Sequence, residues 1–179
     1  MNIQRIDWLR RLCSALAMLA FAPPNGVRAE ISTDGSVGPR VQLDGPEFAI
    51  GADLGTRAGG NLFHSFERFF LGPNERATFS GPNQVENIIS RVTGGERSGI
   101  DGTIRSAIAG ANFYFINPAG VVFGPNARLD VAGSFHVSTA DELRFADGVA
   151  FSATDPAASS FTVAAPDAFG FLGPPRPRC

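Results

Sequence analysis

The stretch Ile116–Val131, INPAGVVFGPNARLDV, alternates short apolar runs with turn-forming residues. The apolar runs are interrupted by Asn117-Pro118, Ala119-Gly120 and Gly124-Pro125-Asn126. Pro and Gly are the strongest local signals for a change of chain direction. Short β-prone pieces surround it, among them ANFYFI before it and SFHVST and ELRF after it. We expect the stretch to form two successive rungs of a repetitive β structure together with their corners.

Two β architectures fit this pattern. Short apolar pieces that each end in a tight turn are typical of a β-solenoid, in which every rung buries side chains against its neighbours. A β-sandwich also has short strands with turns, and no strict fixed-length repeat decides between the two. Further strands are expected at Val41–Leu43, Glu47–Ile50 and Ser160–Val163. Gly59–Leu71, GGNLFHSFERFFL, alternates over only part of its length, which favours one strand plus a turn.

The segment Gln84–Gly95, QVENIISRVTGG, is ambiguous. Val85, Ile88, Ile89 and Val92 have helical spacing. The segment is also dense in β-branched residues and is bounded by Gly-Pro-Asn and Gly-Gly, which favours a strand. We expect a strand.

Residues 1–29 have the layout of a secretory signal peptide, with Arg5, Arg10 and Arg11 ahead of a short apolar run and a small-residue site at the end. The run is shorter than the roughly 20 residues that a bilayer span needs. We expect cleavage between Ala29 and Glu30. Cys179 then stands alone, so an exported domain without an internal disulfide must rely on packing and backbone pairing.

The composition is that of one globular domain, with 44% hydrophobic and 18% charged residues. All 15 basic residues are Arg, they are scattered, and the formal net charge is −2. A nucleic-acid partner is therefore not expected, because such proteins concentrate basic residues in a patch or stripe.

The polar residues give no clear catalytic set. His64 and His136 lack the spacing of a metal site, and no nucleophile elbow is present, so we expect both rings to pack beside aromatic side chains. Five aspartates occur one per turn, which favours a turn-forming role; a glycosidase-like pair or a calcium site is the alternative. They are Asp101, Asp130, Asp141, Asp147 and Asp155. No cofactor is expected, and Asn117 and Asn126 are candidates for structural residues between rungs.

Several motifs occur together in one order: GGNLFHSFERF, VENIISRVTGG, IDGTIRS, the long stretch from Ala111 to Gly148, and DAFGFL. Over Glu30–Leu172 the chain resembles the N-terminal secretion domain of two-partner-secretion exoproteins of the filamentous-haemagglutinin type. The resemblance implies an all-β, right-handed parallel β-helix with an N-terminal cap, and a protein that is not an enzyme. It also implies export by the Sec machinery, binding of the unfolded chain by the POTRA domains of an outer-membrane β-barrel transporter, and a secreted or cell-surface adhesin.

The resemblance also points to recognition residues. The family's Asn-Pro-Asn-Gly-Ile motif falls on Asn117, Pro118, Ala119, Gly120 and Val121, where Ala119 departs from the pattern. A second family motif, Asn-Pro-Asn-Leu, retains only Pro82 and Asn83. The resembling stretch NLFHSF adds further expected contacts to the transporter, namely Asn61, Phe63, His64 and Phe66.

The chain is divided into a signal peptide (1–29), a secretion domain (30–172) and a Pro-rich tail (173–179) that we expect to be a truncated end of a longer exoprotein. Two other functions stay open. One is a stand-alone adhesin domain that binds host or bacterial cell-surface glycans, and the other is a β-helix enzyme that cleaves polysaccharides.

Overall fold

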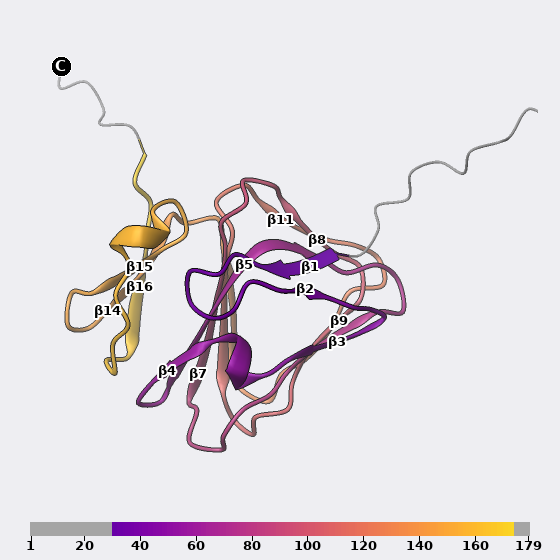
Figure 1. Ribbon diagram of the computed structural model, residues 1–179, viewed down its shortest axis with the longest axis horizontal. Coiled ribbons are helices and arrows are strands. Elements are labelled where there is room, and N and C mark those ends of the chain that lie inside the picture. The colour runs from indigo at the N-terminus through magenta and orange to yellow at the C-terminus, as the bar shows by residue number, and fades with distance from the viewer. Residues whose placement is uncertain (1–29, 174–179) are drawn as a thin grey trace, which may run out of the picture.

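The computed structural model describes residues 30–173. The chain winds through three parallel β-sheets, which form the three sides of a coil (Figure 1). Strands of successive coils pair in parallel on each side. The expected parallel β-helix is confirmed, and the sandwich is excluded. The expected signal peptide with Ala29, and the tail from residue 174, lie outside the described residues.

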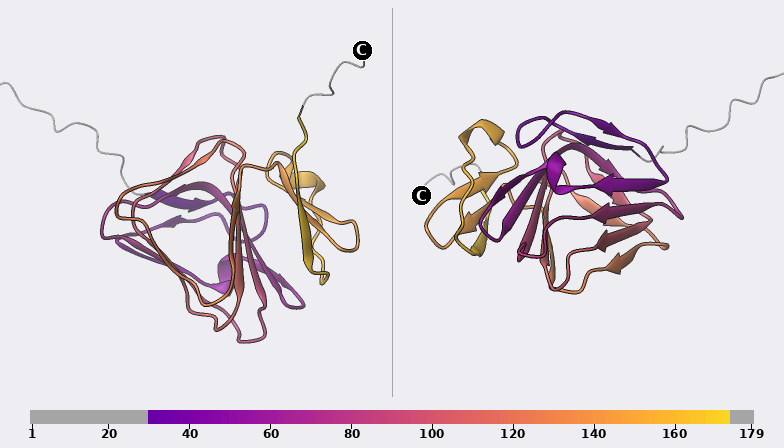
Figure 2. Two further views of the ribbon diagram at one scale, coloured as in Figure 1. Left: turned by 180° about the vertical axis from the view of Figure 1, so that it is seen from behind. Right: turned by 60° about the horizontal axis from the view of Figure 1, so that its bottom comes forward.

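Each side of the coil is one sheet. Side A contains β5 (Asn61–Phe70), β7 (Asn87–Val92), β10 (Asn112–Ile116) and β13 (Phe135–Ser138). Side B contains β3 (Glu47–Ile50), β6 (Arg76–Phe79), β9 (Thr103–Ser106) and β12 (Arg128–Asp130). Side C contains β8 (Ser98–Ile100) and β11 (Val121–Phe123), and Leu71 pairs there with Ile100. The stacking of strands from coil to coil is seen from the side in Figure 2.

We expected the stretch Ile116–Val131 to form two successive rungs, and this prediction is wrong. After the end of β10 it runs along side C as β11 and along side B as β12, so it supplies two sides of one coil. Its Pro- and Gly-containing turns are the corners between sides. The coils differ in length. Hydrogen-bonded partners on side A are separated by 26, 25 and 22 residues in successive coils. This variation explains why the sequence has no strict repeat.

An antiparallel cap covers the first coil. β1 (Glu30–Thr33) and β4 (Thr56–Ala58) both pair with β5, and β2 (Gln42–Leu43) pairs with β1. The short 3-10 helix η1 (Ala52–Leu54) connects side B to β4. The starting edge of side A is therefore closed along β5. The strands expected near residues 41–43 and 47–50 are confirmed.

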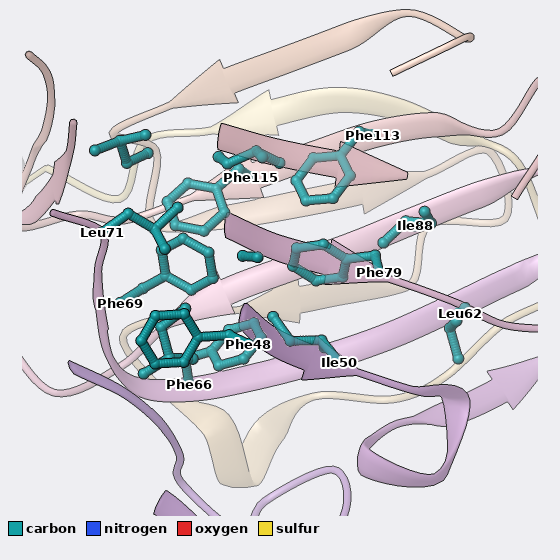
Figure 3. Packing of buried hydrophobic residues seen from close by; sticks show 14 of the residues in the cluster. Phe48, Ile50, Leu62, Phe66, Phe69, Leu71, Phe79, Ile88, Phe113 and Phe115 are labelled. Carbon is teal, nitrogen blue, oxygen red and sulfur yellow. The ribbon is translucent and has the colours of Figure 1, made fainter. Parts of the chain in front are cut away.

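The interior of the coil is rich in phenylalanine. Phe66, Phe69, Phe79, Phe113 and Phe115 are fully buried and pack edge-to-face or stacked between coils (Figure 3). Burying one such side chain stabilises the fold by about 1.5–3 kcal/mol. A continuous column of this kind supplies by packing the stability that disulfides supply in many small exported domains.

The prediction of one strand plus a turn over Gly59–Leu71 is wrong, because β5 is a single ten-residue strand. Its pairing with β1 passes over Glu67: Thr33 faces Phe66 and Ser32 faces Arg68. Such a bulge changes which residues of a strand face inward. Phe66 and Phe69 therefore both reach the core, and simple alternation fails.

A small antiparallel sheet packs on the outer face of side A. It consists of β14 (Glu142–Phe145), β15 (Ala150–Ser152) and β16 (Pro166–Gly170), with the 3-10 helix η2 (Pro156–Ala158) after β15 (Figure 1). We call it the C-terminal sheet. Phe145 and Phe151 from this sheet cover Phe63 and Ile89 of side A. Side A is thus buried on both faces.

Burial on both faces explains the apolar pattern of Gln84–Gly95. Ile88 belongs to the inner cluster and Ile89 to the outer one, so neighbouring apolar residues serve opposite faces of one strand. The expected strand is confirmed as β7.

The strand expected at Ser160–Val163 is wrong. This segment is irregular, and the strand lies later, at β16. Phe161 packs against Phe63, and the carbonyl oxygen of Thr162 accepts a hydrogen bond from Asn61 Nδ2 at 2.8 Å. Contacts with side A therefore hold the segment in place without a strand ladder.

The last coil leaves inward-facing apolar residues exposed. Leu129 has the register position of Ile104, and Val137 that of Phe115, but they are 50% and 39% exposed. Among residues 30–173, β13 pairs along one edge only, with β10. The core is therefore closed at its first coil and open at its last. Residues 30–173 contain no helix that is long and apolar enough to cross a membrane.

Candidate functional site

The corner between β10 and β11 is organised by the side chain of Asn117, which is 1% exposed. Its Nδ2 donates to Ser98 Oγ at 2.9 Å and to the Glu96 carbonyl oxygen at 3.0 Å, and its Oδ1 accepts from the Ala119 amide at 2.9 Å. The Asn117 backbone amide donates to the Ser138 carbonyl oxygen at 3.0 Å. Asn117 thus joins three coils, which confirms its structural role.

The rest of the corner faces outward. Pro118 and Val121 are half-buried, and Ala119 is exposed. The Gly120 amide donates to the Asn117 carbonyl oxygen at 2.9 Å, and its φ of 119° is one that residues with a side chain rarely adopt. A shallow pocket of about 170 Å³ adjoins the corner; Thr93, Pro118 and Thr154 are among its lining residues. Ala119 is thus the exposed residue of the motif in the folded domain.

The structure does not bring Pro82 and Asn83 to this corner. Both are exposed in the turn between β6 and β7, where the Pro82 carbonyl oxygen accepts from the Val85 amide at 3.1 Å. That turn precedes the first residue of β7, whereas Asn117 follows the last residue of β10. Because these strands are parallel neighbours, the two motifs lie at opposite ends of side A.

The four expected contacts on β5 are buried in the folded domain. Phe66 and His64 face the core, Phe63 faces the C-terminal sheet, and Asn61 is 1% exposed. A partner can reach these side chains only before the chain folds. Their expected role in recognition stays a prediction about the unfolded chain.

Asn61 begins a row of asparagines that sequence reasoning missed. Asn87 Nδ2 donates to Asn61 Oδ1 at 2.9 Å, and Asn112 Nδ2 donates to Asn87 Oδ1 at 3.1 Å. At the near end, Asn61 Nδ2 donates to the carbonyl oxygens of Thr162 and Ala164. The near-equal separations of 26 and 25 residues were the signal that could have revealed this ladder.

His64 is buried among aromatic rings. Its ring stacks on Phe66 and lies edge-to-face with Phe79, at centroid distances of 6.2 and 5.5 Å. Neither ring nitrogen has a hydrogen-bond partner among the described residues. Burial lowers the pKa of His64 to about 4, against the nearby Leu54 backbone and the charge of Asp53, which both favour the charged ring. His136 stacks on Tyr114 at 4.5 Å, so the expected aromatic packing of both histidines is confirmed.

The aspartates are held in separate local networks. Asp101 accepts from the backbone amide and the Nδ2 of Asn126 in the next coil, so Asn126 links two coils as expected, although it is exposed. Asp130 pairs with Arg105. Asp147 accepts from Thr162, and Asp155 from the Ala158 amide. Asp141 accepts from the Leu172 amide at 2.5 Å. No group of three or more His, Cys, Asp or Glu residues within 30–173 could hold a metal ion.

The chain forms a parallel β-helix with a capped first coil and an Asn-Pro-x-Gly corner. A family model described as "TPS secretion domain" matches residues 29–170. The chain belongs to this family. Its TPS domain therefore comprises the cap, the three-sided coil and the C-terminal sheet, since all of these elements lie within the matched residues.

The TPS domain is also similar to a curated protein, the heme/hemopexin-binding protein of Haemophilus influenzae (strain ATCC 51907 / DSM 11121 / KW20 / Rd). The two chains are 36% identical over 73 residues, which cover 41% of this chain and 7% of that protein. The matched region is thus a small fraction of that relative's length. The similarity supports a role of this chain in a two-partner-secretion exoprotein.

Proposed function

We propose that this TPS domain is the recognition module of a two-partner-secretion exoprotein. The POTRA domains of a cognate outer-membrane transporter bind it while it is unfolded, and it folds after transport to the cell surface or the medium. The family match over residues 29–170 is the observation that carries this proposal. On this proposal the domain acts by recognition and carries out no catalysis.

The burial pattern supports recognition before folding. The stretch from Asn61 to Phe66 is fully buried in the folded domain, as is Asn117. An unfolded β-prone segment can instead pair with the exposed edge of a sheet in its partner, with backbone hydrogen bonds for affinity and side-chain pockets for specificity. Folding then withdraws the same side chains from the partner, so release and folding are linked.

Substitutions at the Asn117 corner must separate recognition from stability. Asn117 holds three coils together, so its loss impairs folding and secretion at once. Ala119 is exposed and departs from the Asn-Pro-Asn-Gly-Ile motif in polarity, whereas Val121 replaces Ile by another β-branched aliphatic residue. Ala119→Asn therefore tests recognition with little effect on packing. Ala109→Asn, in the exposed Ala109-Gly110 turn, is the matched control.

The experiment measures binding of purified POTRA domains to the chain from Glu30 onward, held unfolded in urea and, separately, folded in buffer. We expect the unfolded chain to bind and the folded chain to bind at least about tenfold more weakly, which corresponds to about 1.4 kcal/mol. Ala119→Asn strengthens binding of the unfolded chain, Pro118→Ala weakens it, and Ala109→Asn leaves it unchanged. Equal binding of folded and unfolded chains, or none by either, contradicts the proposal.

A groove on side C favours a second candidate, the glycan-binding adhesin. It has a volume of about 380 Å³, and its lining includes the partly exposed ring of Phe70 together with Pro73, Val122 and the side chain of Arg97. An apolar surface with a few polar groups is typical of small-molecule sites. The test is a glycan array probed with the folded domain, with Phe70→Ala as the variant expected to lose any signal.

A further inference from the structure

Arg91 is the largest fully buried side chain of the domain. It lies on β7 and points toward the C-terminal sheet, where its guanidinium carbon lies 4.1 Å from the centre of the Phe151 ring. A buried cation is stable only if its donors are paired, because removing the charge from water is costly. Burial also lowers the pKa of Arg91 to about 10, against the charge of Asp34.

The donors of Arg91 are paired with three separate parts of the chain. Nε donates to Ser65 Oγ of β5 at 2.7 Å, and Nη2 donates to Ser36 Oγ of the cap at 2.8 Å. Nη1 donates to Ser159 Oγ at 2.5 Å and to the Ser152 carbonyl oxygen, both of which belong to the C-terminal sheet and its following turn. We call these five residues the Arg91 hub.

Asp34 completes the charge balance through two serines. Ser65 Oγ donates to Asp34 Oδ2 at 2.6 Å, and Ser36 Oγ donates to Oδ1 at 2.7 Å. Thr93 Oγ1 also donates to Oδ2, at 2.7 Å. Burial alone would raise the pKa of Asp34, but these hydrogen bonds outweigh it and lower the pKa. The carboxylate therefore stays charged and balances the guanidinium without direct contact.

We propose that the Arg91 hub is a folding lock, in which docking of the C-terminal sheet and closure of the N-terminal cap depend on each other through one buried cation. Ser36 and Ser159 are 123 positions apart along the chain (159 − 36) and contact the same guanidinium. Without Ser159, Arg91 Nη1 keeps the Ser152 carbonyl oxygen but loses its hydroxyl acceptor; without Ser36, which is itself exposed, Nη2 loses its serine acceptor and becomes open to water. The complete hub therefore exists only when the chain from Ser36 to Ser159 is in place.

The lock goes beyond recognition by a transporter, and its test does not depend on that function. It concerns the order in which the purified domain folds and opens. In the setting of export, it delays completion of the fold until the C-terminal sheet is available. A coil that lacks that sheet keeps the charged Arg91 side chain on the same face as the apolar side chains of Phe63 and Ile89.

A double-mutant cycle tests the lock in the chain from Glu30 onward. Ser36→Ala and Ser159→Ala are made singly and together, and unfolding in urea gives the equilibrium constant of each variant. Residues without mutual contact normally have additive effects, whereas those that share a partner do not. We expect the effect of Ser36→Ala on this constant to change by at least about threefold when Ser159 is already alanine.

The same cycle in an Arg91→Met background is the decisive control. Methionine fills much of the space without a charge, and buried ionic groups can often be replaced by apolar ones without loss of stability. We expect the two serine effects to become additive there. In the matched control cycle, Ser106→Ala takes the place of Ser159→Ala. Ser106 is part-buried, and its hydroxyl forms hydrogen bonds with the backbone of Ile108. We expect its effect to be additive with that of Ser36→Ala in both backgrounds.

Hydrogen exchange gives an independent measurement if Arg91→Met is too unstable for the cycle. In the wild type we expect β1 and β14 to open together, with matching free energies of exchange. In the milder Ser159→Ala variant β14 opens separately and at least about tenfold more often than β1. Additive serine effects in the wild-type background, or independent opening of β1 and β14 in the wild type, overturns the lock.

Discussion

The side-chain amide of Asn117 lies 2.9 Å from the hydroxyl oxygen of Ser98, which belongs to the preceding coil. Asn117, the first residue of the corner that matches the family's Asn-Pro-x-Gly pattern, thus also joins neighbouring coils. A loss of secretion on mutation of Asn117 can therefore arise from a fold defect as well as from lost recognition.

Asn117→Ala is expected to destabilise the folded domain by about 1–3 kcal/mol, because it leaves the Ser98 hydroxyl and the Glu96 carbonyl without their buried donor. Urea unfolding followed by circular dichroism measures the change. Ala119→Ser, at the exposed position of the same corner, should stay within about 0.5 kcal/mol of the wild type. Equal stabilities for the two variants would show that Asn117 has no structural role.

The asparagine ladder should be sensitive at its middle residue. Asn87→Ala removes the donor to Asn61 Oδ1 and the acceptor of Asn112 Nδ2 together, and we expect a loss of about 1–3 kcal/mol. Asn83→Ala, in the exposed turn before the same strand, is the control and should be nearly neutral. The same unfolding measurement decides; a neutral Asn87→Ala would mean that the ladder adds nothing to stability.

His64 should make the domain sensitive to acid. Its pKa falls from 6.5 in the unfolded chain to about 4 in the folded domain, so folding favours the neutral ring. The stabilisation is complete above about pH 6.5 and is lost as the pH falls toward 4, with a total change of about 3 kcal/mol. The free energy of unfolding, measured from pH 7 to pH 4, should decrease over that window.

His64→Leu removes the titrating ring and should flatten this part of the pH profile, even if the variant is less stable at neutral pH. His136→Gln, at the other histidine, is the matched control. If the slope between pH 6.5 and 4 persists unchanged in His64→Leu, His64 is not its source.

The last coil should tolerate truncation better than the coil before it. Ile104 and Leu129 hold the same register position on side B, but Ile104 is fully buried and Leu129 is half exposed. Ile104→Ala should cost about 2–5 kcal/mol. Leu129→Ala should cost much less, because its side chain has little surrounding structure to lose. Thermal or urea unfolding of the two variants compares them directly, and equal losses would contradict an open last coil.

The turns and short strands were predictable because each depends on a few neighbouring residues. Asn117-Pro118 and Gly124-Pro125 marked true corners, and β9, β10 and β11 occur where short β-prone pieces were expected. The winding of the chain was not derivable from such local signals alone, since a sandwich has similar ones. The resemblance to a known family supplied it.

The error over Gly59–Leu71 has its physical origin in side A, where β5 and β7 are buried on both faces. The rule of alternating apolar and polar residues assumes one wet face, and β5 violates it twice, through the cover of the C-terminal sheet and through the bulge at Glu67. Arg91 was the overlooked clue. A charged residue within the apolar run IISRV indicates either an exposed face or a buried polar network, and only the structure shows Ser36 and Ser159 around it.

The closed first coil and the open last coil give the domain a direction. At the start, the antiparallel partners of β5 occupy the edge where another parallel strand would bind. At the other end, the unpaired edge of β13 and the inward-facing side chains of Leu129 and Val137 already define the register and the apolar pattern that an added coil must match. On side A the folded domain is thus a directional template: a further parallel coil finds a free edge at β13, whereas the corresponding edge of β5 is occupied by the cap.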